Sequence, residues 1–207
     1  MEILSRLHAL FERVSLWAVW AGGLGMLISA LIVFVEIVGR KMGGTEIVPG
    51  LALPEFRVPG SDEYTGYVFA GATTWAYAYC LIHRSHIRID ALYNILSMRV
   101  RAVLDVVGLA LLLVYVAFFT ERAWVVWIES WAKQSVSVTP ELTPLWIPQI
   151  FWVTGLTFFL IVNAFLVIHS FAALVTGRIA VVQQIAGTMS VQEEVAESTH
   201  GVQEMKK

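Results

Sequence analysis

The stretch Val14–Val35, VSLWAVWAGGLGMLISALIVFV, decides the fold, because its 22 residues include no charge. A helix of about 20 apolar residues crosses the hydrocarbon core of a bilayer. The stretches 64–82 and 147–177 also lack Asp, Glu, Lys and Arg, and a shorter uncharged stretch covers 106–120. These patterns predict an all-α integral membrane protein. Its four transmembrane helices should cover about residues 14–38, 63–84, 102–124 and 148–174.

The composition supports a membrane protein and excludes several other classes. Of the 207 residues, 57% are hydrophobic and 14% are charged, whereas a soluble domain has about 25% charged residues. Disorder, a coiled coil and an ordinary soluble enzyme are therefore excluded. The net charge of −2 argues against nucleic-acid binding, which needs a basic face. The lone Cys80 rules out an internal disulfide and a multi-cysteine metal site, and we expect neither a metal nor a cofactor.

The distribution of Lys and Arg predicts that both termini are cytoplasmic. With four spans, nine of these residues fall on the side of the termini and five on the other side, and cytoplasmic loops carry the excess. We expect residues 1–13 to form an amphipathic interfacial helix and 178–207 a polar cytoplasmic tail, with the transmembrane domain at 14–177. The segment after His86 repeats the amphipathic pattern and should also lie on the membrane surface.

The predicted spans lack a transport site of their own. Transporters usually place ionisable groups near mid-membrane, but here such groups lie at the span ends. Asn163 is the best polar candidate inside a span. A hydrogen bond to a neighbouring helix explains it better than a transport role does. We therefore expect that the chain forms no substrate pathway alone.

Small residues recur at four-residue steps on the first two spans. Such faces let helices approach closely. They can pack within the chain, which we favour, or dock onto another membrane protein. The residues are Ala21, Gly25 and Ser29 on the first span, and Gly66, Ala70, Thr74 and Ala78 on the second.

Charged residues gather at the outer ends of the first two spans. Glu36 and Arg40 are four residues apart and can pair on one helix face, although simple solvation is about equally expected. Ser61 is a candidate N-cap for the second span, and Asp62 and Glu63 suit the positive end of its helix dipole. Arg40 could also reach Asp62 or Glu63 across the external loop.

The inner end of the second span carries the densest polar cluster, His83–Asp90. Its basic residues suit a membrane anchor that contacts anionic lipid, and Asp90 could cap the helix that follows. A haem anchor is an alternative, because His83, His86 and His169 all fall on the inner side. A free-standing exporter or channel is a further alternative, against which the uncharged spans argue.

Four motifs in order resemble the small membrane subunit of tripartite ATP-independent periplasmic (TRAP) transporters, the DctQ-like family. The resemblance covers about residues 12–175, and the external loop before residue 60 is longer than is usual for the family. The motifs are Val35–Glu36–Ile37–Val38–Gly39–Arg40, Gly60–Ser61–Asp62–Glu63–Tyr64–Thr65–Gly66–Tyr67, His86–Ile87–Arg88–Ile89–Asp90 and Thr143–Pro144–Leu145–Trp146–Ile147–Pro148–Gln149.

The resemblance implies a non-catalytic scaffold subunit in the bacterial inner membrane. Its partners would be a large membrane subunit, which carries the substrate and sodium sites, and a periplasmic substrate-binding protein. The cargo would be a carboxylate-bearing organic acid such as a C4-dicarboxylate, driven by an ion gradient. Under this resemblance, Glu36, Arg40, Asp62 and Glu63 organise the external docking side. His86, Arg88 and Asp90 would fix the inner loop.

Overall fold

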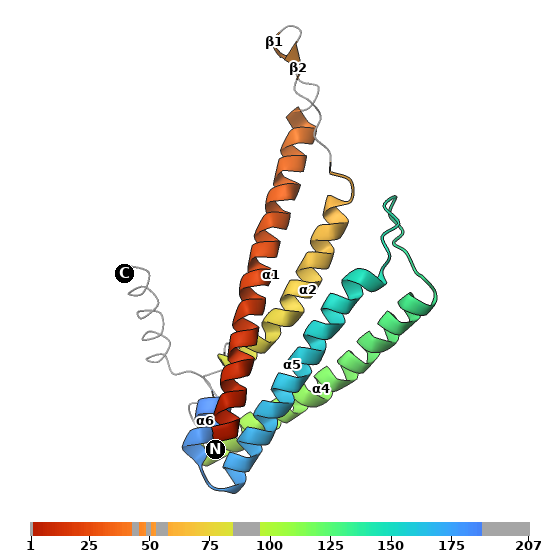
Figure 1. Ribbon diagram of the computed structural model, residues 1–207. Helices are drawn as coiled ribbons and strands as arrows, with labels where there is room; N and C mark the ends of the chain where they lie inside the picture. Colours follow the sequence, from red (N-terminus) through yellow and green to blue (C-terminus); the bar gives the residue numbers. More distant parts are fainter. Residues whose placement is uncertain (1, 43–45, 49–50, 53–57, 85–95, 188–207) are drawn as a thin grey trace. The chain divides into compact units, whose positions relative to one another are not determined.

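Helices account for nearly all of the regular structure in the computed structural model, which describes residues 2–42, 46–48, 51–52, 58–84 and 96–187 (Figure 1). The antiparallel strands β1 (Glu46–Val48) and β2 (Leu51–Ala52) form a small hairpin after the first helix. The helices are α1 (Glu2–Met42), α2 (Ser61–Ile82), α4 (Met98–Ala132), α5 (Trp146–Val175) and the short α6 (Ile179–Ala186).

Three of these helices are long and apolar enough to cross a membrane: α1 over Arg6–Lys41, α4 and α5. They confirm an all-helical transmembrane region in outline and support a multi-pass membrane protein. The 22 residues of α2 are long enough to cross, but its Tyr, Thr, Trp and Gly residues lower the hydropathy of that helix. The fourth span therefore stays a prediction, and so does the orientation of the termini.

Helical structure extends beyond the predicted transmembrane domain at both ends. α1 is one continuous helix from Glu2, without a break between residues 13 and 14. The Phe11 ring packs edge-on against the ring of Phe158, 6.2 Å away on α5. The segment 178–207 begins with α6, in which Val182 and Ala186 are buried. Residues 188–207 lie outside the described residues.

The chain divides into two compact units, and the larger contains residues 1–79 and 118–159. In this unit α1 and α2 lie side by side (Figure 1). A Cβ atom placed on Gly22 would lie only 3.0 Å from the Cβ atom of Ala72. A Cβ atom placed on Gly155 of α5 would lie 2.5 Å from the hydroxyl oxygen of Thr74 on α2. Glycine is required at such positions for close helix approach.

Indole groups reinforce the contacts between helices in this unit. Trp75 on α2 donates a hydrogen bond from Nε1 to the Phe151 carbonyl on α5, at 3.0 Å. On α4, the indole of Trp127 donates to the Trp146 carbonyl at 3.2 Å, and the ring of Trp131 lies 4.7 Å from that of Trp146 in a T-shaped arrangement. The half-buried indoles of Trp75 and Trp127 thus find partners for their N–H groups while their rings contact neighbouring side chains.

The smaller unit contains the described residues of 80–117 and 160–187. Its buried apolar side chains include Leu109, Leu166 and Val182. Arg84, just after α2, donates a hydrogen bond to the Gln183 carbonyl of α6 at 3.2 Å. This bond joins the chain after α2 to α6 within the unit.

Candidate functional site

A buried carboxylate links the ends of α1 and α2. Glu36 on α1 is 4% exposed. Its Oε1 accepts a hydrogen bond from the Arg40 guanidinium at 2.5 Å, and its Oε2 accepts one from the Ser61 hydroxyl at the first residue of α2. Hydrogen bonds to an ionised group are among the stronger ones in proteins. The Glu36 carboxylate therefore joins α1 to α2 through Ser61, while Arg40 holds it from within α1.

A second carboxylate links α2 to the connection between α4 and α5. Glu63 accepts a hydrogen bond from the Tyr67 hydroxyl at 2.5 Å, one turn further along α2. It also accepts one from the hydroxyl of Thr139. The hydroxyls of Thr139 and Ser137 lie 2.7 Å apart, and the Thr143 N–H donates to Ser137 at 3.1 Å. These bonds fix the connecting loop against the start of α2.

The two carboxylates border a polar hollow of about 400 Å³ at these helix ends. Asp62 is exposed there, and a Cβ atom on Gly60 would lie 2.9 Å from the Glu141 side chain. The charged groups around the hollow are four carboxylates and one guanidinium, so the surface is acidic. They belong to Glu36, Asp62, Glu63, Glu141 and Arg40.

The structure brings the expected external residues together but with different partners. The i, i+4 pair of Glu36 and Arg40 is formed. In the described part of the chain Arg40 pairs with Glu36 rather than with Asp62 or Glu63. The Ser61 hydroxyl, predicted as an N-cap, instead donates to Glu36. The inner-loop residues His86, Arg88 and Asp90 lie outside the described residues.

The small-residue face of α2 is used in part inside the chain. Thr74 and Ala78 are buried, with Thr74 close to Gly155 of α5. By contrast, a Cβ atom on Gly66 would meet nothing within 4 Å. Ala70 is half-buried.

On α1 the predicted face makes one close contact. A Cβ atom on Gly25 would approach a Val68 methyl group to 3.3 Å, whereas Ala21 is exposed and Ser29 is half-buried. The tightest approach is at Gly22, which sequence reasoning missed because it lies one residue off the four-residue step. Gly155 was also missed, because a lone glycine in an apolar run gives no sign of its contact.

Most polar side chains inside the helices are satisfied by their own backbone. The Thr73, Thr74 and Thr154 hydroxyls donate to carbonyls three or four residues earlier, the usual device for hydroxyls in membrane helices. Asn163 and Ser170 of α5 are fully buried and have no hydrogen-bond partner among the described residues. No group of three or more His, Cys, Asp or Glu suited to a metal ion occurs in the described part of the chain.

Comparison with known proteins identifies the family. Residues 29–177 match the family model described as tripartite ATP-independent periplasmic transporters, DctQ component. The haem-anchor alternative receives no support from this match. No curated protein and no solved structure matches the chain. Because the match covers well over half of the sequence, the chain belongs to the DctQ family, the small permease subunits of tripartite ATP-independent periplasmic transporters.

Proposed function

We propose that this subunit is a non-catalytic scaffold that holds the large membrane subunit of the transporter and carries no substrate itself. The observation that supports this most directly is the placement of its polar groups. Inside the described helices, every threonine hydroxyl except that of Thr120 donates to its own backbone. The hydrogen-bonded carboxylates of Glu36 and Glu63 gather instead at one helix end. A carrier needs polar groups along a path through the membrane.

The proposal includes α2 as the fourth span and both termini in the cytoplasm. The 22 residues of α2 form a helix about 33 Å long, which is enough to cross a hydrocarbon core of about 30 Å. Close contacts of Ala72 with Gly22 and of Thr74 with Gly155 place α2 beside α1 and α5, two helices apolar enough to cross. The excess of Lys and Arg on the side of the termini supports the cytoplasmic orientation.

The acidic hollow is the proposed docking surface for the periplasmic substrate-binding protein. Exposed Asp62 and half-exposed Glu141 can face a basic patch on that protein, and complementary charge speeds and orients association. Glu36 and Arg40 hold the surface in shape through the bond to Ser61. On the inner side, His86, Arg88 and Asp90 would fix the interfacial loop.

The assembled transporter would sit in the bacterial inner membrane. It would take up a carboxylate-bearing organic acid, such as a C4-dicarboxylate, using a sodium gradient. The binding protein would deliver the acid to the large subunit. These expectations rest on family membership.

Co-purification with the products of neighbouring genes tests the proposal. The tagged chain is extracted in mild detergent, and bound proteins are identified by mass spectrometry. A stoichiometric large polytopic membrane protein is expected. Liposomes with the complete complex should take up an organic acid under a sodium gradient, and liposomes with this chain alone should not. Purification with soluble redox subunits and a Soret band would overturn the proposal, as would flux through the chain alone.

A further inference from the structure

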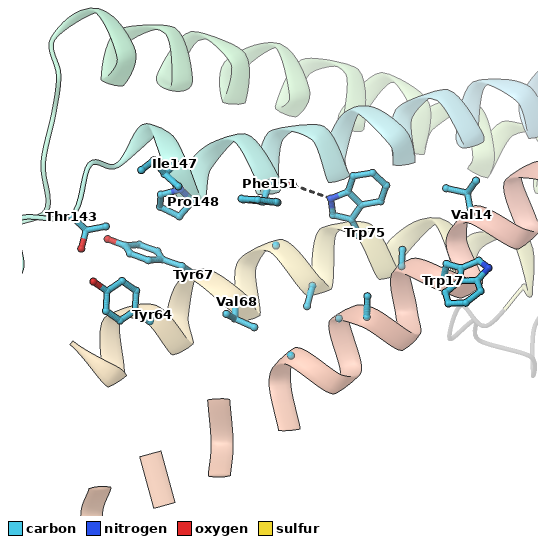
Figure 2. A pocket seen from close by; sticks show the side chains of 16 residues that line it. Val14, Trp17, Tyr64, Tyr67, Val68, Trp75, Thr143, Ile147, Pro148 and Phe151 are labelled. Carbon is cyan, nitrogen blue, oxygen red and sulfur yellow. Dashed lines mark hydrogen bonds between the residues drawn. The ribbon is translucent and has the colours of Figure 1, made fainter. Parts of the chain in front are cut away.

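A large apolar groove in the larger unit lies along α2. It has a volume of about 750 Å³. α1 forms one wall with residues between Val14 and Gly25, and Ile147, Pro148 and Phe151 of α5 form the other (Figure 2). Trp17 is 76% exposed and Phe151 is 61% exposed, so the groove opens to the surroundings of the helices. In a membrane those surroundings are lipid.

One end of the groove is polar, and the rest is not. Figure 2 shows the hydroxyl groups of Tyr64, Tyr67 and Thr143 gathered at the end next to the start of α2, while Val14 and Trp17 lie at the other end. A ligand with a polar head and an apolar tail matches this polarity.

The length of the groove corresponds to one leaflet of the bilayer. On α2 the groove extends from Tyr64 to Trp75. These residues are eleven positions apart, which corresponds to about 17 Å along a helix. Half of the hydrocarbon core is about 15 Å. An acyl chain that starts at the hydroxyl end would therefore run along the groove to the middle of the membrane.

The volume of the groove fits a single small ligand. Small-molecule sites hold about 300–1,000 Å³, and the groove has about 750 Å³. One acyl chain is a ligand of this size class.

The charge beside the hydroxyl end selects among headgroups. Asp62, Glu63 and Glu141 lie around the adjoining acidic hollow, and Arg40 is the basic residue among its lining side chains. This surface attracts an ammonium group and repels an anionic headgroup. We propose that the groove binds an acyl chain of one phospholipid from the leaflet next to the α2 N-terminus, with preference for an ethanolamine headgroup over a glycerol headgroup.

Native mass spectrometry of the full chain tests this proposal. The protein is mixed in detergent with equal amounts of palmitoyl-oleoyl phosphatidylethanolamine and phosphatidylglycerol. Ala21→Phe places a ring in the groove, because Ala21 is an exposed residue of its wall. Ala30→Phe is the matched control, since Ala30 is an exposed residue of the same helix that does not line the groove.

The wild-type chain should retain one phosphatidylethanolamine, and Ala21→Phe should lower its affinity about tenfold, whereas Ala30→Phe should not. Ala18→Leu, at a half-buried wall position, should cause a smaller loss and replaces Ala21→Phe if that variant misfolds. The combined change Asp62→Asn and Glu141→Gln should abolish the headgroup preference.

Equal retention by both Phe variants would overturn the proposal, as would equal binding of the two lipids to the wild-type chain. Loss of the lipid when the large subunit binds would also overturn it, because the groove would then belong to the subunit interface. Lipid retention by the chain alone does not depend on whether the chain co-purifies with that subunit, so failure here is distinct from failure of the proposed function.

Discussion

The hydroxyl of Ser61, at the first residue of α2, donates a hydrogen bond to the buried carboxylate of Glu36 on α1. The two residues are 25 positions apart in the sequence, and this bond ties two helices together at one end. Ser61→Ala removes this donor, whereas the bond from Arg40 to the carboxylate remains.

Ser61→Ala should lower the free energy of unfolding by about 1.5–3 kcal/mol, because hydrogen bonds to charged groups contribute this much. Unfolding in mixed micelles, followed by circular dichroism, measures the loss. Thr73→Val is the matched control, since the Thr73 hydroxyl bonds within its own helix. An equal decrease in the free energy of unfolding for the two variants would show that the hydrogen bond from Ser61 to Glu36 contributes little to stability.

Gly155→Ala should destabilise the chain by about 1–3 kcal/mol, because overpacking a tight contact forces neighbours to move. The new Cβ atom would lie 2.5 Å from the Thr74 hydroxyl oxygen and 2.7 Å from the Trp75 ring. A Cβ atom added at Gly23 in α1 would have no neighbour within 4 Å. Gly23→Ala should therefore stabilise the protein by about 0.5–1 kcal/mol, because alanine loses less backbone entropy in a helix than glycine does. The unfolding midpoints of the two variants should move in opposite directions. A shift in the same direction would contradict the close contact of α2 with α5.

Cysteine labelling should place the two ends of α2 on opposite sides of the membrane. In a Cys80→Ser background, Pro59→Cys should react with a membrane-impermeant maleimide in intact cells. Ser97→Cys should react only after permeabilisation. Both positions are exposed in the structure. Labelling of both from the same side would remove α2 from the set of spans.

Replacement of Asp62 and Glu63 together by Ala should reduce uptake of the organic acid without preventing membrane insertion. Asp62 is exposed beside the hollow, and Glu63 anchors the loop through Thr139. The difference in uptake between the wild type and the double variant should become smaller at high salt, because salt screens exposed charges. Glu121→Ala, at an exposed residue outside the hollow, is the matched control. Normal uptake by the double variant at normal protein levels would refute the docking role.

Uncharged runs made the three most apolar helices predictable. Val14–Val35 lies within α1, and all but the last two residues of the run 147–177 lie within α5. The hydropathy of these runs favours burial in lipid. α2 is harder to assign, because its tyrosines and threonines resemble those of an amphipathic soluble helix. Its close contacts with Gly22 and Gly155 appear only in three dimensions.

The partners at the polar helix ends could not be predicted from the same information. Charge suggested that Arg40 would meet Asp62 or Glu63, yet the side chain that crosses to Glu36 is the neutral Ser61. A serine at the start of a helix is usually explained by capping, which is a local effect. Its long-range bond depends on how α1 and α2 cross, and the apolar groove depends on the same crossing.

The aromatic contacts of Trp127 and Trp131 with Trp146 also bear on the order of folding. They join the end of α4 to the start of α5 across a connection of only 13 residues, 133–145. Contacts between neighbours in sequence form fastest, because little chain entropy is lost in closing a short loop. The α4–α5 hairpin should therefore assemble first after insertion. α1, of which only 6% of the most apolar window is buried, should dock last, so that its bond between Glu36 and Ser61 marks completion of the fold.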